Sequence, residues 1–289
     1  MKGEVTLRLN FVLKFKSVSN LTIRAIAGLI FGVLVLGAAV LGPYALGALF
    51  FFFALAGLIE FYDMVSIDVT GRPRKIFGYA LGLGLYVTIM FYAMEAIEST
   101  WFWLLAPVVI LLYSAELVHL DKRAVDHVGS TVMGLVYVVV PFGMINILAH
   151  IDGTFNYELP VGFFIILWAN DSGAYFTGKF LGRTKLYEKV SPNKTWEGLF
   201  GGIALAVLCG WLLAKYFTSI ETAHWMWIAA IIAVFGNLGD LFESHLKRSY
   251  GVKDSGKIIP GHGGVLDRFD GLLLALPLVI FYLKFILKP

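Results

Sequence analysis

Long apolar stretches alternate with short polar connections along most of this chain. A run of about 20 apolar residues can span the hydrocarbon layer of a bilayer as a helix, and nine such runs occur here. We therefore predict an all-α, polytopic integral membrane protein with about nine transmembrane helices, the first two forming a tight hairpin at Gly42 and Pro43. The predicted segments are 21–41, 43–62, 76–94, 101–120, 129–150, 159–177, 199–217, 225–242 and 271–287.

Composition supports the membrane interpretation. Hydrophobic residues make up 58% of the 289 positions, charged residues only 15%, and the mean hydropathy is +0.79. These values exclude an ordinary soluble domain. The sequence shows no Pro-rich or Gly/Ser-rich linker and no internal repeat, so we expect a single transmembrane domain over 1–289, with 1–20 as a cytoplasmic amino-terminal segment.

The distribution of basic residues predicts the orientation, because Lys and Arg are retained on the cytoplasmic side of membrane proteins. If the N-terminus lies inside, 20 of the 23 basic residues fall in cytoplasmic segments. The two longest cytoplasmic loops, 178–198 and 244–270, are also rich in Lys, Asp, Gly and Pro. We therefore expect the polar site at the cytoplasmic face, with its motifs within 168–270.

Two pairs of acidic residues flank the second of these loops. Asp240 and Glu243 end the eighth predicted span, and Asp267 and Asp270 begin the ninth, with the same separation of three in each pair. That separation places both carboxylates of a pair on one helical face. Together the pairs could share divalent cations, since Mg²⁺ prefers carboxylate oxygens together with water and phosphates. Taken singly, the acids could instead form ion pairs at helix ends, such as Glu243 with Lys247.

The loop between the acidic pairs contains many cations and glycines. Lys247, Arg248 and Lys253 suit a triphosphate or a lipid phosphate. The run Pro260-Gly-His-Gly-Gly contains glycines whose backbone amides could turn toward an anion, and we interpret His262 as a substrate contact. The run 251–257 resembles the start of a nucleotide P-loop, but Ile258 stands where Ser or Thr should meet Mg²⁺, so that motif is rejected.

A second polar segment begins within the sixth predicted span. Asn170 and Asp171 lie in an otherwise apolar run, where an ionised carboxylate needs a partner or a water-filled cavity. Further on, Ser191-Pro-Asn-Lys-Thr195 is predicted to form a turn before the seventh span. In that turn Asn193 is a candidate helix cap and Lys194 is free to reach a phosphate.

These motifs closely resemble those of the phosphatidate cytidylyltransferases, also called CDP-diacylglycerol synthases. The family pattern is met over 27 residues, and its upstream Asn-Asp…Ala-Tyr and Ser-Pro-Asn-Lys-Thr-Trp-Glu-Gly segments are present as well. The resemblance is firm from about Trp168 onward, whereas the first half matches only as a series of hydrophobic spans. The matching positions of the main pattern are Ser244, Lys247, Arg248, Lys253, Asp254, Pro260, Gly261, His262, Gly263, Gly264, Asp267, Arg268 and Asp270.

The resemblance implies that CTP and phosphatidic acid give CDP-diacylglycerol and pyrophosphate, with Mg²⁺ as cofactor. The lipid phosphate would attack the α-phosphorus of CTP in line, and no protein nucleophile is needed. A second cation, monovalent or divalent, is left open. The expected metal ligands are Asp240 and Asp267 first, then Glu243, Asp171 and Asp270; the catalytic residues are Asp240, Asp267, Lys247 and Arg248; the substrate-binding residues are Asn170, Asp171, Lys194, Lys253, His262, Gly263, Gly264 and Arg268.

Other interpretations stay open at this point. A CTP-dependent enzyme acting on another lipid phosphate or on a polyprenol would use the same ions at the same membrane surface. A transporter with Asp171 and Asp240 along its pathway is less favoured, because the polar residues crowd one membrane face and no repeat is visible. We expect a bacterial-type inner membrane protein among membrane lipids, with no nucleic-acid partner, and leave a homodimer open.

Overall fold

The computed structural model describes residues 20–68, 71–119, 123–256, 258 and 263–287, and the described part is mainly helical. Each of the nine predicted segments coincides with one helix or with consecutive helical pieces. The α-helices are α2 (Asn20–Leu41), α3 (Pro43–Val65), α4 (Lys75–Ala93), α5 (Ala106–His119), α6 (Ala124–Gly134), α7 (Val140–Ala149), α8 (Glu158–Leu181), α9 (Trp196–Leu213), α10 (Thr222–Ser249) and α11 (Leu266–Tyr282). Short helical pieces are the 3₁₀ helix Ser99–Leu105 and the π-helical turns Leu135–Val139 and Leu283–Leu287.

Seven helical stretches in the described part of the chain are long and apolar enough to cross a membrane. A shorter apolar helix, Ile26–Leu41, lies within α2. The sixth predicted segment corresponds to α8, in which the polar residues Asn170 and Asp171 interrupt the apolar run. By length and composition, the protein is therefore an integral membrane protein. The seven stretches are Pro43–Val65, Lys75–Ala93, Ser99–Leu117, Ala124–Ala149, Trp196–Leu213, Thr222–Ser249 and Leu266–Leu287.

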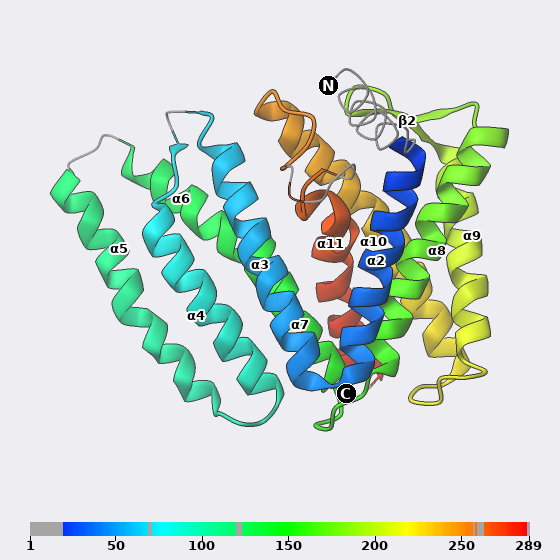
Figure 1. The fold of residues 1–289 in the computed structure, drawn as a ribbon, viewed down its shortest axis with the longest axis horizontal. Helices are drawn as coiled ribbons and strands as arrows, with labels where there is room; N and C mark the ends of the chain where they lie inside the picture. The colour runs from blue at the N-terminus through cyan, green and yellow to red at the C-terminus, as the bar shows by residue number, and fades with distance from the viewer. Residues whose placement is uncertain (1–19, 69–70, 120–122, 257, 259–262, 288–289) are drawn as a thin grey trace, which may run out of the picture.

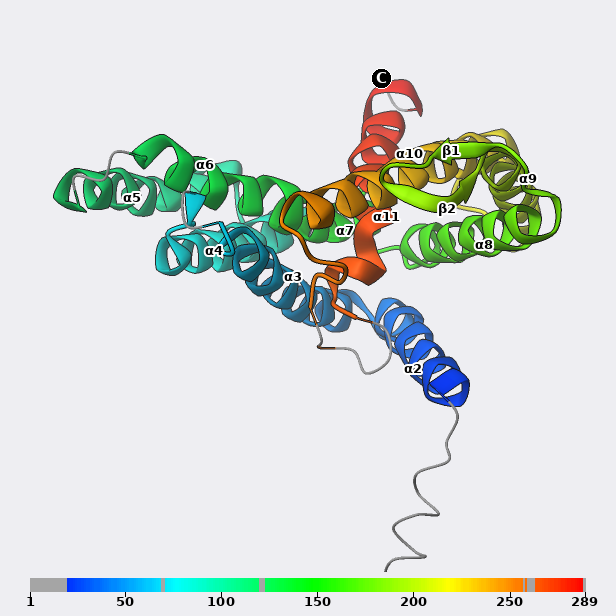
Figure 2. The same ribbon diagram turned by 90° about the horizontal axis from the view of Figure 1, so that it is seen from above.

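The helices run side by side along one direction (Figure 1). Helices α3 to α7 form one side of the molecule, α8, α9 and α10 form the other, and α11 lies between them (Figures 1 and 2). Helix α2 lies next to α3 and also contacts α8. The C-terminal end of α10, the start of α11 and a small antiparallel hairpin lie at the same end of the molecule (Figure 1). The hairpin consists of β1 (Lys185–Tyr187) and β2 (Ser191–Thr195).

Phe269 joins the two sides of the molecule. It is 1% exposed and lies on the first turns of α11 between Arg268 and Asp270. Its ring centroid is 4.9 Å from that of Phe53 on α3 and 6.2 Å from that of Phe164 on α8. Aromatic pairs of this kind contribute about 0.5–1.5 kcal/mol each beyond area burial. The hydrophobic core therefore fixes the position of the polar residues next to Phe269.

The predicted hairpin between the first two spans is confirmed. Helix α2 ends at Leu41 and α3 begins at Pro43, with Gly42 between them at a φ of 120°. Glycine adopts this positive φ without the steric cost that other residues incur, and proline is favoured in the first turn of a helix. This residue pair therefore reverses the chain within one position.

Candidate active site

A cavity of about 610 Å³ opens among α2, α8, α10, α11 and the loop that joins α10 to α11. Its volume lies within the range of about 300–1,000 Å³ that is usual for ligand sites. Ala27, Gly28, Phe31 and Gly32 of α2 form one wall, and Trp168 forms part of another. The cavity gathers eight of the predicted site residues, namely Asp171, Asp240, Lys247, Arg248, Lys253, Asp267, Arg268 and Asp270.

A second cavity of about 270 Å³ lies beneath the hairpin between α8 and α9. It shares Asp171, Asn237 and Asp240 with the larger cavity and adds Lys194. These three shared side chains therefore form a common wall between two spaces. Among the other predicted residues, Asn170, Glu243, Gly263 and Gly264 line neither cavity, and His262 lies outside the described residues.

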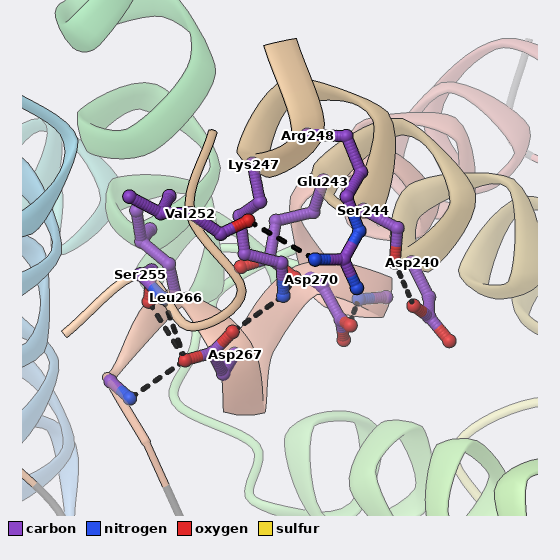
Figure 3. Close-up of polar contacts among 12 residues, drawn as sticks. Asp240, Glu243, Ser244, Lys247, Arg248, Val252, Ser255, Leu266, Asp267 and Asp270 are labelled. Atoms are coloured by element: carbon purple, nitrogen blue, oxygen red, sulfur yellow. Dashed lines mark hydrogen bonds and ion pairs between the residues drawn. The ribbon is translucent and has the colours of Figure 1, made fainter. Parts of the chain in front are cut away.

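The last turns of α10 present a row of polar side chains (Figure 3). The hydroxyl of Ser244 donates to Asp240 Oδ1 at 3.2 Å, one helical turn away. Lys247 Nζ donates to Glu243 Oε2 at 3.1 Å, so the ion pair considered as the alternative to a metal site for these two residues is present. Glu243 is 1% exposed, and its Oε1 has no hydrogen-bond partner in the described structure. A buried oxygen of this kind is a suitable acceptor for a cation or a donor group.

The Asp267 carboxylate accepts hydrogen bonds from both α10 and the loop that joins α10 to α11 (Figure 3). Its Oδ1 accepts from Lys247 Nζ at 2.5 Å. Its Oδ2 accepts from the backbone amides of Ser255 and Gly264, at 3.0 and 2.8 Å, and from the Ser255 hydroxyl at 3.1 Å. The glycine-rich run was expected to turn its amides toward an anionic ligand, but the Gly264 amide is directed at this protein carboxylate instead.

Gly263 shows why the loop needs a glycine at this point. Its φ is +83°, and a Cβ added there would lie 2.6 Å from Asp267 Oδ2. Both the backbone conformation and the space therefore exclude other side chains without a shift of the loop. Glycine at this position allows the loop backbone to lie close to the Asp267 carboxylate, which accepts hydrogen bonds from the loop.

The second predicted segment meets α10 through Lys194 on β2. Its ammonium forms an ion pair with Asp240 Oδ2 at 2.6 Å and donates to the carbonyl of Asn237 at 3.3 Å. The residues before α9 form strand β2 rather than only a turn, and the helix cap is Thr195 rather than Asn193. The Thr195 hydroxyl accepts from the Gly198 amide at 3.1 Å, because this side chain is the one placed at the helix start.

Asn170 and Asp171 have different surroundings despite being neighbours. Asn170 is completely buried, and its Oδ1 accepts from the side-chain amide of Asn237 at 3.2 Å. Asp171 faces both cavities and lies close enough to Asp240 and Lys194 to interact with them electrostatically. Asp171 is therefore accessible to a ligand. Asn170 lies behind the common wall and orients the Asn237 side chain.

Several cations face the same space as these acids. The Arg248 guanidinium donates to the Val252 carbonyl at 3.3 Å, which bends it over the loop (Figure 3). Lys253 and Arg268 also line the larger cavity. Opposite charges on a common surface can hold an anionic ligand and a cation at the same time. The arrangement suits phosphate groups accompanied by a metal ion.

The oxygen donors at the cavity determine whether the site fits Mg²⁺. Within the part of the chain that the structure describes, no group of three or more His, Cys, Asp or Glu side chains is arranged to hold a metal ion. Mg²⁺ is usually held by one or two carboxylates together with substrate phosphates and water. Asp240, Asp267 and Asp270 line the cavity and supply oxygen ligands of that kind. The residues therefore fit Mg²⁺ when substrate oxygens complete its coordination.

The structure adds three residues that the sequence motifs did not single out. Asn237 lies on the common wall of the two cavities, and Ser255 bonds to Asp267. Glu60, from α3, lies beneath the same loop and is 4% exposed. The sequence does contain a signal for Glu60: it is an acid within an apolar span, which is costly unless the acid has a specific role.

Comparisons with known proteins identify the family to which the chain belongs. A model of the cytidylyltransferase family matches residues 22–286. A phosphatidate cytidylyltransferase of Bacillus subtilis is 33% identical over 268 residues, covering 90% of this chain and 96% of the relative. One of Brucella suis is 31% identical over 296 residues, covering 94% and 96%. One of Staphylococcus epidermidis is 48% identical over 118 residues, covering 40% and 45%. The chain thus belongs to the cytidylyltransferase family.

Proposed function

We propose that this protein is a CTP:phosphatidate cytidylyltransferase, which makes CDP-diacylglycerol and pyrophosphate for phospholipid biosynthesis. One observation carries the proposal: carboxylates and cations from two distant segments meet in one cavity of an integral membrane protein of this family. The relatives that cover most of the chain are named phosphatidate cytidylyltransferases, which supports this choice of substrates.

The chemistry requires two anionic substrates to come together. The lipid phosphate oxygen attacks the α-phosphorus of CTP in line, the bond to the β-phosphate oxygen breaks, and pyrophosphate leaves. Lys247, Arg248, Lys253, Lys194 and Arg268 bind the phosphates and offset their repulsion before attack. The side chains of Lys247 and Lys194 are already oriented by Asp267 and Asp240, which limits the reorganisation needed on binding.

Mg²⁺ is the proposed cofactor, and when bound it supplies positive charge to the phosphate oxygens during transfer. Asp240 and Asp267 are the first candidates to hold it, followed by Glu243, Asp171 and Asp270. The unpartnered Oε1 of buried Glu243 is compatible with a second cation next to the first. We leave open whether this cation is monovalent or divalent.

The proposed topology has nine spans, with the active site at the cytoplasmic face of a bacterial-type inner membrane. Two further helices bring the seven apolar stretches to nine: α2, which contains the shorter apolar helix, and α8, whose Asp171 faces both cavities. Three described parts of the predicted cytoplasmic connections, namely the hairpin before α9, the C-terminal end of α10 and the start of α11, lie at one end of the molecule (Figure 1), which supports this topology.

The decisive experiment uses purified protein with CTP, phosphatidic acid and Mg²⁺. We expect release of pyrophosphate and formation of a CMP-bearing lipid, both dependent on lipid and on Mg²⁺. A panel of lipid phosphates and polyprenol substrates, with radiolabelled CTP, separates this proposal from the related lipid enzymes. If CMP is transferred only to another acceptor, the phosphatidate assignment is wrong, although the cytidylyltransferase chemistry stands.

A further inference from the structure

A buried glutamate of the N-terminal half lies directly beneath the start of α11. Glu60 Oε1 accepts from the backbone amide of Val265 at 3.0 Å, and its Oε2 accepts from that of Leu266 at 3.0 Å. No ion pair of Glu60 occurs among the described residues, so backbone and hydroxyl donors satisfy this carboxylate. It lies 205 residues away from Val265 in the chain.

Glu60 acts as a distant cap for α11. The first amides of a helix lack partners within the helix, and a negative charge at this end also interacts favourably with the helix dipole. Val265 precedes the helix and offers no side-chain cap. The Glu60 carboxylate satisfies two of these amides, so it fixes the direction in which α11 leaves the loop.

The Ser255 hydroxyl connects Glu60 to the active site. Its Oγ lies 3.2 Å from Glu60 Oε2 and 3.1 Å from Asp267 Oδ2. Its single proton is donated to one of these two carboxylates at a time. Ser255 is therefore held between a carboxylate beneath the loop and the carboxylate that faces the cavity.

The loop has glycines where Glu60 comes closest. A Cβ at Gly256 would lie 2.3 Å from Glu60 Oε1, and a Cβ at Gly264 would lie 2.4 Å from Oε2. The second glycine of the Gly-Gly pair thus makes room for Glu60, as the first makes room for Asp267. The loop sequence matches a carboxylate supplied by a different part of the chain.

We propose that Glu60 is a positioning residue of the active site, acting through Ser255 and the start of α11 to orient Asp267 and, with it, Lys247. Glu60 lines neither cavity that contains the site residues, so its effect on turnover is indirect. The kinetic part of this inference rests on the proposed function, whereas the anchoring of the loop does not.

Glu60→Gln tests the proposal with almost no change in side-chain size. One carboxylate oxygen becomes an NH₂ group that in either orientation faces the backbone N–H of Val265 or Leu266, so an acceptor is lost and two donors oppose each other. We expect kcat to fall about 10- to 100-fold, the loss typical when a partner that orients a site ligand is removed. The KM values for CTP and phosphatidate should change far less than kcat.

Glu116→Gln is the matched control. Glu116 is also a buried acid of the N-terminal half, 7% exposed, but it binds Arg74 and His127 rather than the loop. It should lower the thermal midpoint while leaving kcat per folded enzyme unchanged. Ser255→Ala keeps the two amide contacts of Glu60, so it should reduce kcat less than Glu60→Gln, and the double variant should be non-additive.

Hydrogen exchange gives a readout that does not depend on turnover. Amides in the peptide 263–270 should exchange faster in Glu60→Gln than in wild type or Glu116→Gln. Unchanged exchange in this peptide, or wild-type kcat per folded Glu60→Gln enzyme, would overturn the proposal. If wild-type protein fails to use phosphatidate, the proposed function is wrong, and the exchange comparison still decides whether Glu60 anchors the loop.

Discussion

The two sides of the molecule differ in the surroundings of their charged side chains. On the side formed by α3 to α7, Arg74, Glu116 and His127 form a compact cluster in which the Arg74 Nη2 atom lies 3.0 Å from Glu116 Oε2. On the side formed by α8, α9 and α10, Asp171 and Asp240 line cavities. The Glu116 side chain is 6% exposed, whereas that of Asp240 is 41% exposed.

This difference distinguishes charges that join helices from charges that are available to a ligand. A buried ion pair with satisfied partners fixes the packing of its helices and leaves little capacity for further binding. Asp240 has a partner in Lys194, but the pair lies at a cavity wall where a phosphate or a cation can exchange with either member. Glu60 lies on α3, but its hydrogen bonds are to the loop and to the start of α11, next to the larger cavity.

Asp267→Asn should give the largest effect, because it changes a charge that faces the larger cavity. The variant keeps the side-chain size but removes the charge that orients Lys247. We expect kcat to fall on the order of 10³-fold, as when a preorganised electrostatic group of a reaction site is lost. The matched control is Asp63→Asn, because Asp63 is exposed and pairs with Lys75 on the other side of the molecule. Pyrophosphate release measures both variants, and unchanged turnover in Asp267→Asn would remove Asp267 from the proposed metal site.

Lys194→Met should give the next largest effect. It removes the ammonium that bonds to Asp240 and leaves this carboxylate without its cation at the wall between the cavities. We expect a loss of about 100-fold in kcat/KM for CTP, equal to about 2.7 kcal/mol, which is within the range for truncating a partly buried charge pair. Lys75→Met removes an exposed ion pair and should leave the kinetics unchanged. Equal effects of the two variants would contradict a role of Lys194 in substrate binding.

The sequence motifs identify the C-terminal residues that line the larger cavity, because most of them are close together in the chain. The row Asp240, Ser244 and Lys247 follows from helical spacing alone, and Asp267 follows from the motif that continues it. The hydrophobic segments also coincide with the observed helices, since the length of an apolar run determines a span with little help from tertiary contacts.

The remaining features depend on contacts between distant segments. No local pattern connects Glu60 with Val265, and the direction of the Gly264 amide depends on the side chain of Asp267. The change from Asn193 to Thr195 as the cap has a similar origin, because β2 pairs with β1 and α9 therefore begins directly after Thr195. Sequence spacing gives the identity of such groups, whereas tertiary packing decides which partner each one finds.

Arg74→Met changes the charged cluster on the side formed by α3 to α7. The guanidinium bonds to Glu116 and lies 3.3 Å from His127 Nδ1, so its removal leaves a buried carboxylate with fewer donors. We expect the free energy of unfolding to fall by about 2 kcal/mol, the cost of a buried polar group that loses its partner. Thermal unfolding in detergent measures the change, and kcat per folded enzyme should equal that of wild type. A large loss of kcat without destabilisation would mean that this cluster also serves the active site.

Thr195→Ala should give the smallest effect, and it separates capping from binding within the C-terminal side. Its hydroxyl caps α9 by accepting from the Gly198 amide at 3.1 Å, and the adjacent Lys194 faces the cavity. Loss of such a cap lowers stability by about 1 kcal/mol, so a reduced thermal midpoint with a smaller change in kcat than in Lys194→Met is expected. Thr195→Ser keeps the hydroxyl and should retain most of the wild-type stability. If the serine variant is as unstable as the alanine variant, the methyl group against Gly182, rather than the cap, stabilises this helix start.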